Sequence, residues 1–429
     1  MKIQIHRGAR QIGGCITEIA TEGCRILIDL GSNLPGNSPD GADGDRAEEL
    51  TKAEVEKLTD GVDALFYTHY HGDHVGLLPW VPPHIPQYIG AGAREVMQCK
   101  YAYLHQEETH QAIGRMRTYT IARRIDVGGK GKLFVTPYFV SHSAFDAYMF
   151  KIECEGKTIL HTGDFRSHGY LGKGLEPTLL GHVGRVDILI TEGTMLGRQT
   201  ESVWKEADIK DNVIDLLKKH KYVFALCSST DLDRLASFHQ ACKDTGRLFC
   251  VDRYQQRVLD IFTRYAGQRQ KLFCFDKVCL LGDDKTGNLW YKMHRQGFLM
   301  PVRVSHSSLV KALLCKYADD PAWLIYSLWS GYAEHGKPYS NERIRELREL
   351  FGDRIADGTR DGFHTSGHAD VATLRKVCEI VNPRIGVIPI HKERNTSYRE
   401  ILHTDAWHIF TESETLIEHP LGNIAVLLR

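Results

Sequence analysis

The stretch Thr68–Val75, with the sequence THYHGDHV, contains three histidines and one aspartate. It directly follows an apolar run, VDALFY, which is typical of a buried strand, so these polar side chains leave a strand end together and enter a loop. His69 and His71 are two residues apart and can bring both imidazoles to one ion, whereas Asp73 and His74 can face a second ion nearby. Neutral imidazole and carboxylate are ligands that Zn²⁺ and similar divalent ions prefer. The stretch therefore predicts a metal site.

The alternative is a surface loop that is rich in histidine by chance, because the chain has 22 histidines. The order HxHxDH favours the metal site, and so do polar residues that follow other strand-like segments. These are Asp29, His142, Asp164, Glu192 and His391, with His368 in a further polar stretch. Groups that all stand at strand ends build one site along the edge of a sheet. Asp29 would hydrogen-bond a ligand histidine from behind, although a simple turn aspartate is the other interpretation.

Length and composition limit the classes of protein. The 429 residues suggest two domains at roughly 150 residues per domain. The chain has 54 basic and 54 acidic side chains, so a polyanion would have to be held by a local patch or by the metal. The eleven cysteines include no CxxC pair, which predicts free thiols in the cytoplasm. We find neither a signal peptide nor a run of about 18 apolar residues, so we expect neither secretion nor membrane insertion.

The N-terminal part reads as short strands. Segments 2–6, 15–19 and 25–30 predict a meander. The segment Asn33–Asp45 is rich in Gly, Pro, Asn and Asp and predicts an exposed loop. The following segment, Ala47–Leu58, predicts a helix in which Thr51–Glu54 resembles a capping box, either inside the helix or at a point where the helix restarts.

The middle of the chain has a different pattern. Strand-like runs at Val223–Cys227 and Leu248–Asp252 alternate with helical runs such as Asp231–Thr245, as in a parallel α/β unit. After His364 the earlier pattern of strands with polar ends resumes. We therefore predict three parts: residues 1–202, an inserted domain at 203–355, and a return to the first domain at 356–429.

The HxHxDH stretch resembles the signature of the metallo-β-lactamase superfamily. This resemblance implies two zinc ions, with Mn²⁺ as a possible substitute. It assigns ligands to each ion: His69, His71 and His142 to the first, Asp73, His74 and His391 to the second, and Asp164 as the bridge between them. Two adjacent divalent ions activate a shared water and neutralise charge on an acyl or phosphoryl oxygen, so the ions alone do not select the substrate.

The inserted domain, Glu192 after an apolar strand, the stretch HTSGH at 364–368 and the PIH at 389–391 resemble the β-CASP nucleases, and within them ribonuclease J. The implied fold is an αββα sandwich interrupted by an α/β β-CASP domain. In that family the residue matching His368 is the general acid and the residue matching Glu192 orients it. The resemblance also implies that Asp73 is a catalytic residue, in addition to His368 and Glu192. The expected contacts to the substrate are His364, Ser366, Thr230 and Arg234.

Some residues have a second interpretation or depart from the family pattern. Ser366 and Gly367 could also cap a helix at 369–381. Lys392 stands where the family usually has glycine, and Thr230-Asp231 replaces a serine-asparagine pair. Because the chain stops at Arg429, we expect it to lack the extra C-terminal domain of many bacterial ribonucleases J.

Three functions compete on this basis. The first is a zinc-dependent phosphodiesterase that cleaves single-stranded nucleic acid in exo or endo mode, with RNA as the preferred candidate substrate. The second is a hydrolase of a small ester or phosphodiester, which zero net charge and the altered insert favour. The third is a non-catalytic RNA-binding scaffold, against which the full set of metal candidates argues. The expected partners are single-stranded nucleic acid and a second copy of the chain in a homodimer, with no membrane.

Overall fold

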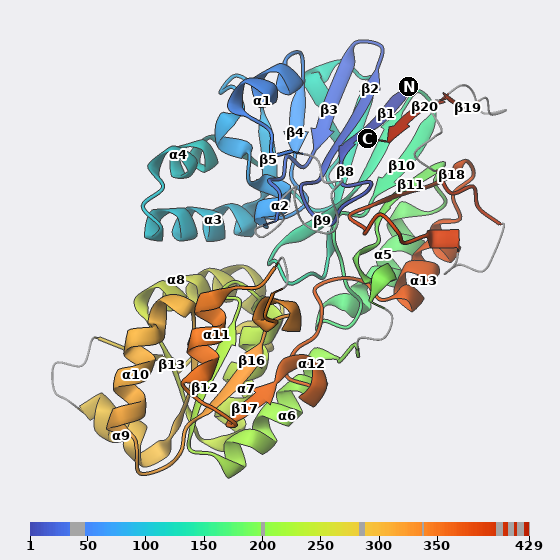
Figure 1. The fold of residues 1–429 in the computed structure, drawn as a ribbon. Helices are drawn as coiled ribbons and strands as arrows, with labels where there is room; N and C mark the ends of the chain where they lie inside the picture. The colour runs from blue at the N-terminus through green and yellow to red at the C-terminus, as the bar shows by residue number, and fades with distance from the viewer. Residues whose placement is uncertain are drawn as a thin grey trace. The chain divides into compact units, whose positions relative to one another are not determined.

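The computed structural model describes residues 1–34, 48–198, 202–282, 288–336, 339–399, 406–410, 416–417 and 424–428. Most of the exposed loop predicted at Asn33–Asp45 lies outside these residues, and so does Ala47. The helix predicted from Ala47 begins only at Lys52, because residues 48–51 are not helical and Thr51 is the N-cap. The chain divides into two compact units (Figure 1). The first unit contains Met1–Ser167, Leu171–Thr200 and Gly367–Arg429; the second contains His168–Tyr170 and Glu201–Ser366.

The first unit contains two sheets in its described part. The larger sheet has, in spatial order, β19 (Leu416–Ile417), β20 (Ile424–Leu428), β1 (Lys2–Arg7), β2 (Ile16–Thr21), β3 (Cys24–Ile28), β4 (Ala64–Phe66), β5 (Gln87–Gly90) and β6 (Arg117–Tyr119). The smaller sheet has β18 (Gly386–Ile390), β11 (Ile188–Glu192), β10 (Lys157–His161), β9 (Ala147–Cys154), β8 (Leu133–Val140) and β7 (Ile125–Asp126). The N-terminal meander is as predicted, because β2 pairs antiparallel with both β1 and β3.

The two sheets face each other across a buried apolar core. Phe66 of β4 and Phe150 of β9 meet there edge to face, with ring centroids 5.9 Å apart. Neighbouring residues of a strand point to opposite faces, so Ile188 and Ile190 of β11 enter this core while Leu189 enters a second one. The smaller sheet is therefore buried on both faces, as its nearly continuous apolar strands require.

Helices cover the outer faces of both sheets. Figure 1 shows α1 (Lys52–Thr59) and α3 (Ala91–Tyr103) beside the larger sheet, and α5 (Leu175–Thr178) and α13 (Val371–Val381) beside the smaller one. Leu374 and Val377 of α13 belong to the second core. The capping box of α1 is confirmed, since Thr51 Oγ1 accepts from Glu54 N and Thr51 N donates to Glu54 Oε2. The αββα sandwich predicted from the sequence is confirmed.

The second unit contains one sheet in its described part, and every strand pair in it is parallel. The order is β14 (Cys279–Leu280), β13 (Leu248–Val251), β15 (Phe298–Val302), β12 (Tyr222–Cys227), β16 (Trp323–Ser327) and β17 (Ile355–Asp357). The helices of this unit are α6 (Glu206–Lys219), α7 (Leu232–Thr245), α8 (Arg253–Phe262), α9 (Asn288–Gln296), α10 (Ser307–Lys316), α11 (Glu342–Glu349) and α12 (Gly358–Asp361). The predicted alternation of strands and helices is confirmed. In the described part of the chain, no helix is both long and apolar enough to cross a membrane.

Candidate metal centre

The candidate ligands all follow the ends of strands in the first unit. His69 and the short helix α2 (Gly72–Val75) follow β4, and His142 follows β8. Asp164 follows β10, and His391 follows β18. Strands β10, β11 and β18 are parallel, so their carboxyl ends meet at one edge of the smaller sheet. The topology thus brings together residues that are more than 300 positions apart in the sequence.

Three histidines form the first group. One ring nitrogen from each of His69, His71 and His142 lies within 4.8 Å of the other two. His142 Nε2 and His71 Nδ1 are 3.2 Å apart. Burial, followed by the charge of neighbouring histidines, holds the pKa of His69 and His142 well below the ordinary value. Burial also lowers the pKa of His71 to about 4, so the metal-free rings are neutral at neutral pH, which is the state that binds a metal.

Two aspartates and two histidines form the second group. His391 Nε2 lies 3.2 Å from Asp73 Oδ2 and 3.6 Å from Asp164 Oδ2. His74 Nε2 lies 3.1 Å from the same oxygen of Asp164, and His69 Nε2 of the first group lies 3.9 Å from it. Asp164 therefore stands between the two groups. All seven residues that the sequence proposed as metal ligands lie in this one cluster.

Outer partners orient the ligand histidines through Nδ1. Asp29 Oδ2 is 2.7 Å from His74 Nδ1, and the same carboxylate accepts from the backbone N and the hydroxyl of Thr68. Thr194 Oγ1 is 2.7 Å from His391 Nδ1, and the carbonyl oxygen of Gly367 is 2.7 Å from His142 Nδ1. Such contacts fix the ring orientation and the tautomer of metal-binding histidines.

The residues present fit divalent cations. His69 Nε2 is buried and has no hydrogen-bond partner among the described residues. His74 Nε2 also lacks a partner of acceptable hydrogen-bond geometry, although Asp164 Oδ2 is 3.1 Å away. Burial opposes ionisation of Asp164, but the charges of His391 and His74 outweigh it and hold the pKa of Asp164 well below its usual value. A bound divalent cation would compensate the charge of these carboxylates and give the imidazole nitrogens a partner.

A glutamate and a histidine stand beside the cluster. Glu192 is fully buried, and its Oε2 is 2.8 Å from His368 Nδ1. Its Oε1 accepts from the backbone N of Phe165 and of Ala369. His368 Nδ1 is also 3.8 Å from Asp164 Oδ2. Burial lowers the pKa of His368, but the charges of Glu192 and Asp164 outweigh burial and raise that pKa above the ordinary value.

The four expected substrate contacts, His364, Ser366, Thr230 and Arg234, lie in the second unit. Arg234 is only 1% exposed, and its guanidinium donates to both carboxylate oxygens of Glu206. It also donates to Ser327 Oγ, and Nη1 lies 3.2 Å from His364 Nδ1.

One helix cap was interpreted wrongly. The N-cap of α13 is Asp370, whose side chain accepts from Thr373 N, and not Ser366 or Gly367. The HTSGH stretch therefore ends before the helix begins. The carbonyl oxygen of Ser366 instead accepts from His168 Nε2, within the second unit.

Sequence reasoning missed three residues of this centre. Thr68 and Thr194 orient ligand histidines, and their places directly before His69 and directly after Glu192-Gly193 were the available signal. Cys15 lies within 4.8 Å of the ligand atoms of His74 and His391. It follows two glycines in the sequence, which gave no sign of a ligand pattern.

Comparison with known families agrees with this geometry. Residues 16–194 match the model of the metallo-beta-lactamase superfamily, so the chain carries a metallo-β-lactamase domain. His69, His71, Asp73, His74, His142 and Asp164 fall within the matched residues.

The chain is similar to proteins named ribonuclease J over most of its length. It is 24% identical over 404 residues to the ribonuclease J of Mycobacterium tuberculosis (strain CDC 1551 / Oshkosh), which covers 90% of this chain and 67% of that protein. It is 28% identical over 207 residues to an RNase J-like protein of Methanocaldococcus jannaschii, covering 45% of this chain and 42% of that protein. The resemblances that the sequence indicated, to the superfamily and to ribonuclease J, are confirmed.

A solved structure also matches. The crystal structure of a protein of unknown function from Enterococcus faecalis V583 matches with a TM-score of 0.68 and covers 99% of both chains. Its sequence is 15% identical, so this match shows the shared fold alone.

Proposed function

We propose that this protein is a metal-dependent nuclease that hydrolyses phosphodiester bonds of single-stranded nucleic acid, with RNA as the first candidate. The observation that carries the proposal is the combination of two features: a cluster of seven ligand-type residues, five of them buried, and a Glu192–His368 pair beside it. A metal cluster alone would suit several hydrolytic reactions. The adjacent histidine, held by a buried carboxylate, adds the proton donor that a poor leaving group needs.

The two metal groups define the proposed cofactor. His69, His71, His142 and Asp164 would hold one Zn²⁺, and Asp73, His74, His391 and Asp164 would hold the other, with Mn²⁺ as a substitute. When bound, such ions lower the pKa of water and neutralise the charge that develops on a phosphoryl group. Imidazole nitrogens and carboxylate oxygens are the donor set on which this assignment rests.

His368 is the proposed general acid. Its Nδ1 faces Glu192 Oε2 at 2.8 Å, so the proton for the leaving 3′ oxygen would come from Nε2. The orientation of the Glu192 side chain is fixed, because Phe165 N and Ala369 N both donate to its other carboxylate oxygen. The carboxylate therefore fixes the ring and favours its protonated form, which is the form that a general acid must take.

The second unit is the proposed β-CASP-like domain. The sequence predicted this insertion at residues 203–355, whereas the compact unit runs from Glu201 to Ser366. We propose that His364, Ser366 and Thr230 contact the nucleic acid. Arg234 is assigned a different task, because its guanidinium already donates to both oxygens of the buried Glu206. A cytoplasmic location fits the cysteines, since no disulfide is assigned to any of them among the described residues.

The second candidate is hydrolysis of a small phosphodiester or ester. The observation that favours it is the formal net charge of zero, which gives no overall attraction to a polyanion. The nature of the substrate therefore has to be tested directly.

A substrate panel tests the proposal. The metal-reconstituted protein would be assayed on end-labelled 5′-monophosphate RNA, on DNA of the same sequence and on a chromogenic small phosphodiester. Asp73→Asn removes a ligand, and His110→Gln on helix α4 (Glu107–Arg115) changes a histidine outside the cluster as the matched control. Cleavage of RNA by the wild type and by His110→Gln, with loss in Asp73→Asn, supports a nuclease. Cleavage of the small substrate alone supports the second candidate.

A further inference from the structure

Cys15 lies at the metal centre although no ligand pattern includes it. It stands directly before β2, which begins at Ile16, it is only 2% exposed, and its backbone joins two segments of the site. Cys15 N donates to the carbonyl oxygen of Asp73 at 2.9 Å, and Gly31 N donates to the carbonyl oxygen of Cys15 at 3.1 Å. The backbone of Cys15 is therefore held against the short helix α2 that carries Asp73 and His74.

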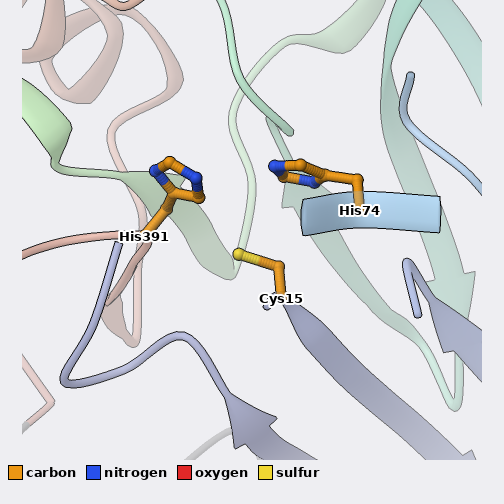
Figure 2. Close-up of side chains that lie close together, drawn as sticks. All are labelled: Cys15, His74 and His391. Carbon is orange, nitrogen blue, oxygen red and sulfur yellow. The ribbon is translucent and has the colours of Figure 1, made fainter. Parts of the chain in front are cut away.

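The thiol points at two ligand histidines. Figure 2 shows the sulfur of Cys15 directed toward the space between the rings of His74 and His391. Its Sγ and one ring nitrogen of each histidine lie within 4.8 Å of one another. The Nδ1 atoms of both rings are occupied by Asp29 and Thr194, so both rings present Nε2 to the cluster. His74 is 1% exposed, and its Nε2 lacks a partner of hydrogen-bond geometry among the described residues.

The glycine at position 8 leaves space for the sulfur of Cys15, and a side chain at that position would fill this space. Gly8 has a φ of 104°, and a Cβ atom at that position would come within 3.0 Å of Cys15 Sγ. The carbonyl oxygen of the same glycine accepts from His391 N at 2.6 Å. One glycine thus adjoins both the thiol and the backbone of a ligand histidine.

We infer that Cys15 Sγ is a ligand of the ion held by His74 and His391. This inference rests on the metal centre of the proposed function and extends its donor set. A zinc–sulfur distance of about 2.3 Å and a zinc–nitrogen distance of about 2.0–2.1 Å place two donors of one ion at most about 4.4 Å apart. The sulfur and the two ring nitrogens lie within 4.8 Å of one another, so small side-chain movements suffice to bring all three to one ion. The thiol releases its proton to solvent as the sulfur–metal bond forms.

A thiolate changes which metal the site prefers. Carboxylate and water suit Mn²⁺, whereas a soft thiolate selects Zn²⁺ and similar ions. The group without Cys15 offers imidazoles and the carboxylates of Asp73 and Asp164, a set that both metals accept. With Cys15 the same group becomes selective for Zn²⁺ over Mn²⁺, and Co²⁺ serves as a spectroscopic substitute for zinc.

Cobalt spectroscopy tests the assignment without use of activity. Purified full-length protein would be stripped of metal and titrated with Co²⁺ under reducing conditions, and its near-ultraviolet spectrum recorded. A thiolate ligand gives a sulfur-to-cobalt charge-transfer band. Cys15→Ser keeps the size of the side chain but lacks that band. Cys24→Ser is the matched control, because Cys24 is also 2% exposed and lies in the same unit outside the described ligand groups.

We expect the band in the wild type and in Cys24→Ser, and its loss in Cys15→Ser. Cys15→Ser should still bind the metal of the first group. Its affinity for the second equivalent of zinc should fall at least ~10–100-fold, which is the loss typical of removing a residue that only hydrogen-bonds a ligand. Metal uptake without the band, or a band that survives in Cys15→Ser, overturns the assignment and leaves the proposed nuclease intact. Absence of metal uptake by the wild type contradicts both. If Cys15→Ser misfolds, X-ray absorption at the zinc edge of the wild type decides through the presence or absence of a sulfur neighbour.

Discussion

His368 Nδ1 lies 2.8 Å from Glu192 Oε2, although 176 positions separate the two residues. Glu192 ends strand β11, while His368 stands just before helix α13, in the segment that returns to the first unit. The pair therefore exists only when the late segment is packed against the smaller sheet. The proposed general acid is therefore placed correctly only when the first unit is fully folded.

Removal of His368 should slow cleavage in proportion to how much the leaving group needs a proton. We expect His368→Ala to reduce RNA cleavage about 10²–10⁴-fold. A nitrophenyl phosphodiester releases a stable anion and should lose far less. Single-turnover rates on both substrates, together with metal content, measure this difference. Equal losses on the two substrates, or loss of metal, would contradict the role of proton donor.

Replacement of Asp29 should weaken metal binding without removing a ligand. Asp29 Oδ2 faces His74 Nδ1 at 2.7 Å and also accepts from Thr68. Asp29→Asn keeps the shape but removes the charge that orients and polarises the ring. We expect about a 10–100-fold lower zinc affinity, measured by competition with a chelator. Full affinity in Asp29→Asn would mean that Asp29 only shapes the backbone.

The candidate metal ligands could be brought into one predicted cluster from the sequence because each follows an apolar strand. Parallel strands place such residues at one edge of a sheet, and the order HxHxDH added a specific pattern. Cys15 could not be found in this way, since it stands before a strand instead of after one, and its backbone hydrogen bonds with Asp73 and Gly31 place it at the site. Those contacts depend on tertiary packing and leave no local signal.

The inserted unit was predicted less completely. Strand β15 was missed although it lies between β13 and β12. It contains Pro301, and proline is normally confined to edge strands because it lacks a backbone N–H. The sheet nevertheless accepts Pro301 opposite Ala225. Arg234 shows a second limit of sequence patterns. Its place in a motif does not reveal that its guanidinium forms a buried ion pair with Glu206.

The first unit should lose stability in acid partly through Glu18. Burial disfavours the charge on this carboxylate, but hydrogen bonds from His6 and Arg25 and the charge of Arg25 outweigh burial and lower its pKa to about 2. The unfolded pKa is about 4.3, so the unfolded state binds more protons between these values. The stabilisation is therefore complete above about pH 5 and is lost as pH falls toward 2.

Urea unfolding of the metal-free protein between pH 7 and pH 3 measures this effect. Metal-free protein avoids the separate loss of metal in acid. We expect the difference in unfolding free energy between wild type and Glu18→Gln to shrink as pH falls. A difference that stays constant over this range would show that Glu18 acts through packing alone.

The buried pair of Arg234 and Glu206 should be structural. The two side chains are 1% and 0% exposed, and two guanidinium nitrogens contact the carboxylate at 3.0 and 3.1 Å. Removal of one partner leaves an uncompensated buried charge, so Arg234→Met should lower the unfolding free energy by about 3–5 kcal/mol. Replacement of both residues by apolar ones of similar size should restore most of this loss. Tryptophan fluorescence suits the measurement, because Trp204, Trp290, Trp323 and Trp329 lie in the second unit.

The double variant Glu206→Leu, Arg234→Met also separates the two roles that Arg234 could play. It lacks the guanidinium but contains no unpaired buried charge, so its folding is close to that of the wild type. If Arg234 is structural, the variant binds single-stranded RNA with wild-type affinity, measured by fluorescence anisotropy with a 5′-monophosphate oligonucleotide. Thr230→Ala is the comparison within the same unit, because Thr230 remains a proposed contact and should weaken binding without a large effect on folding. A stable double variant that binds RNA much more weakly would return Arg234 to the substrate contacts that the sequence pattern predicted.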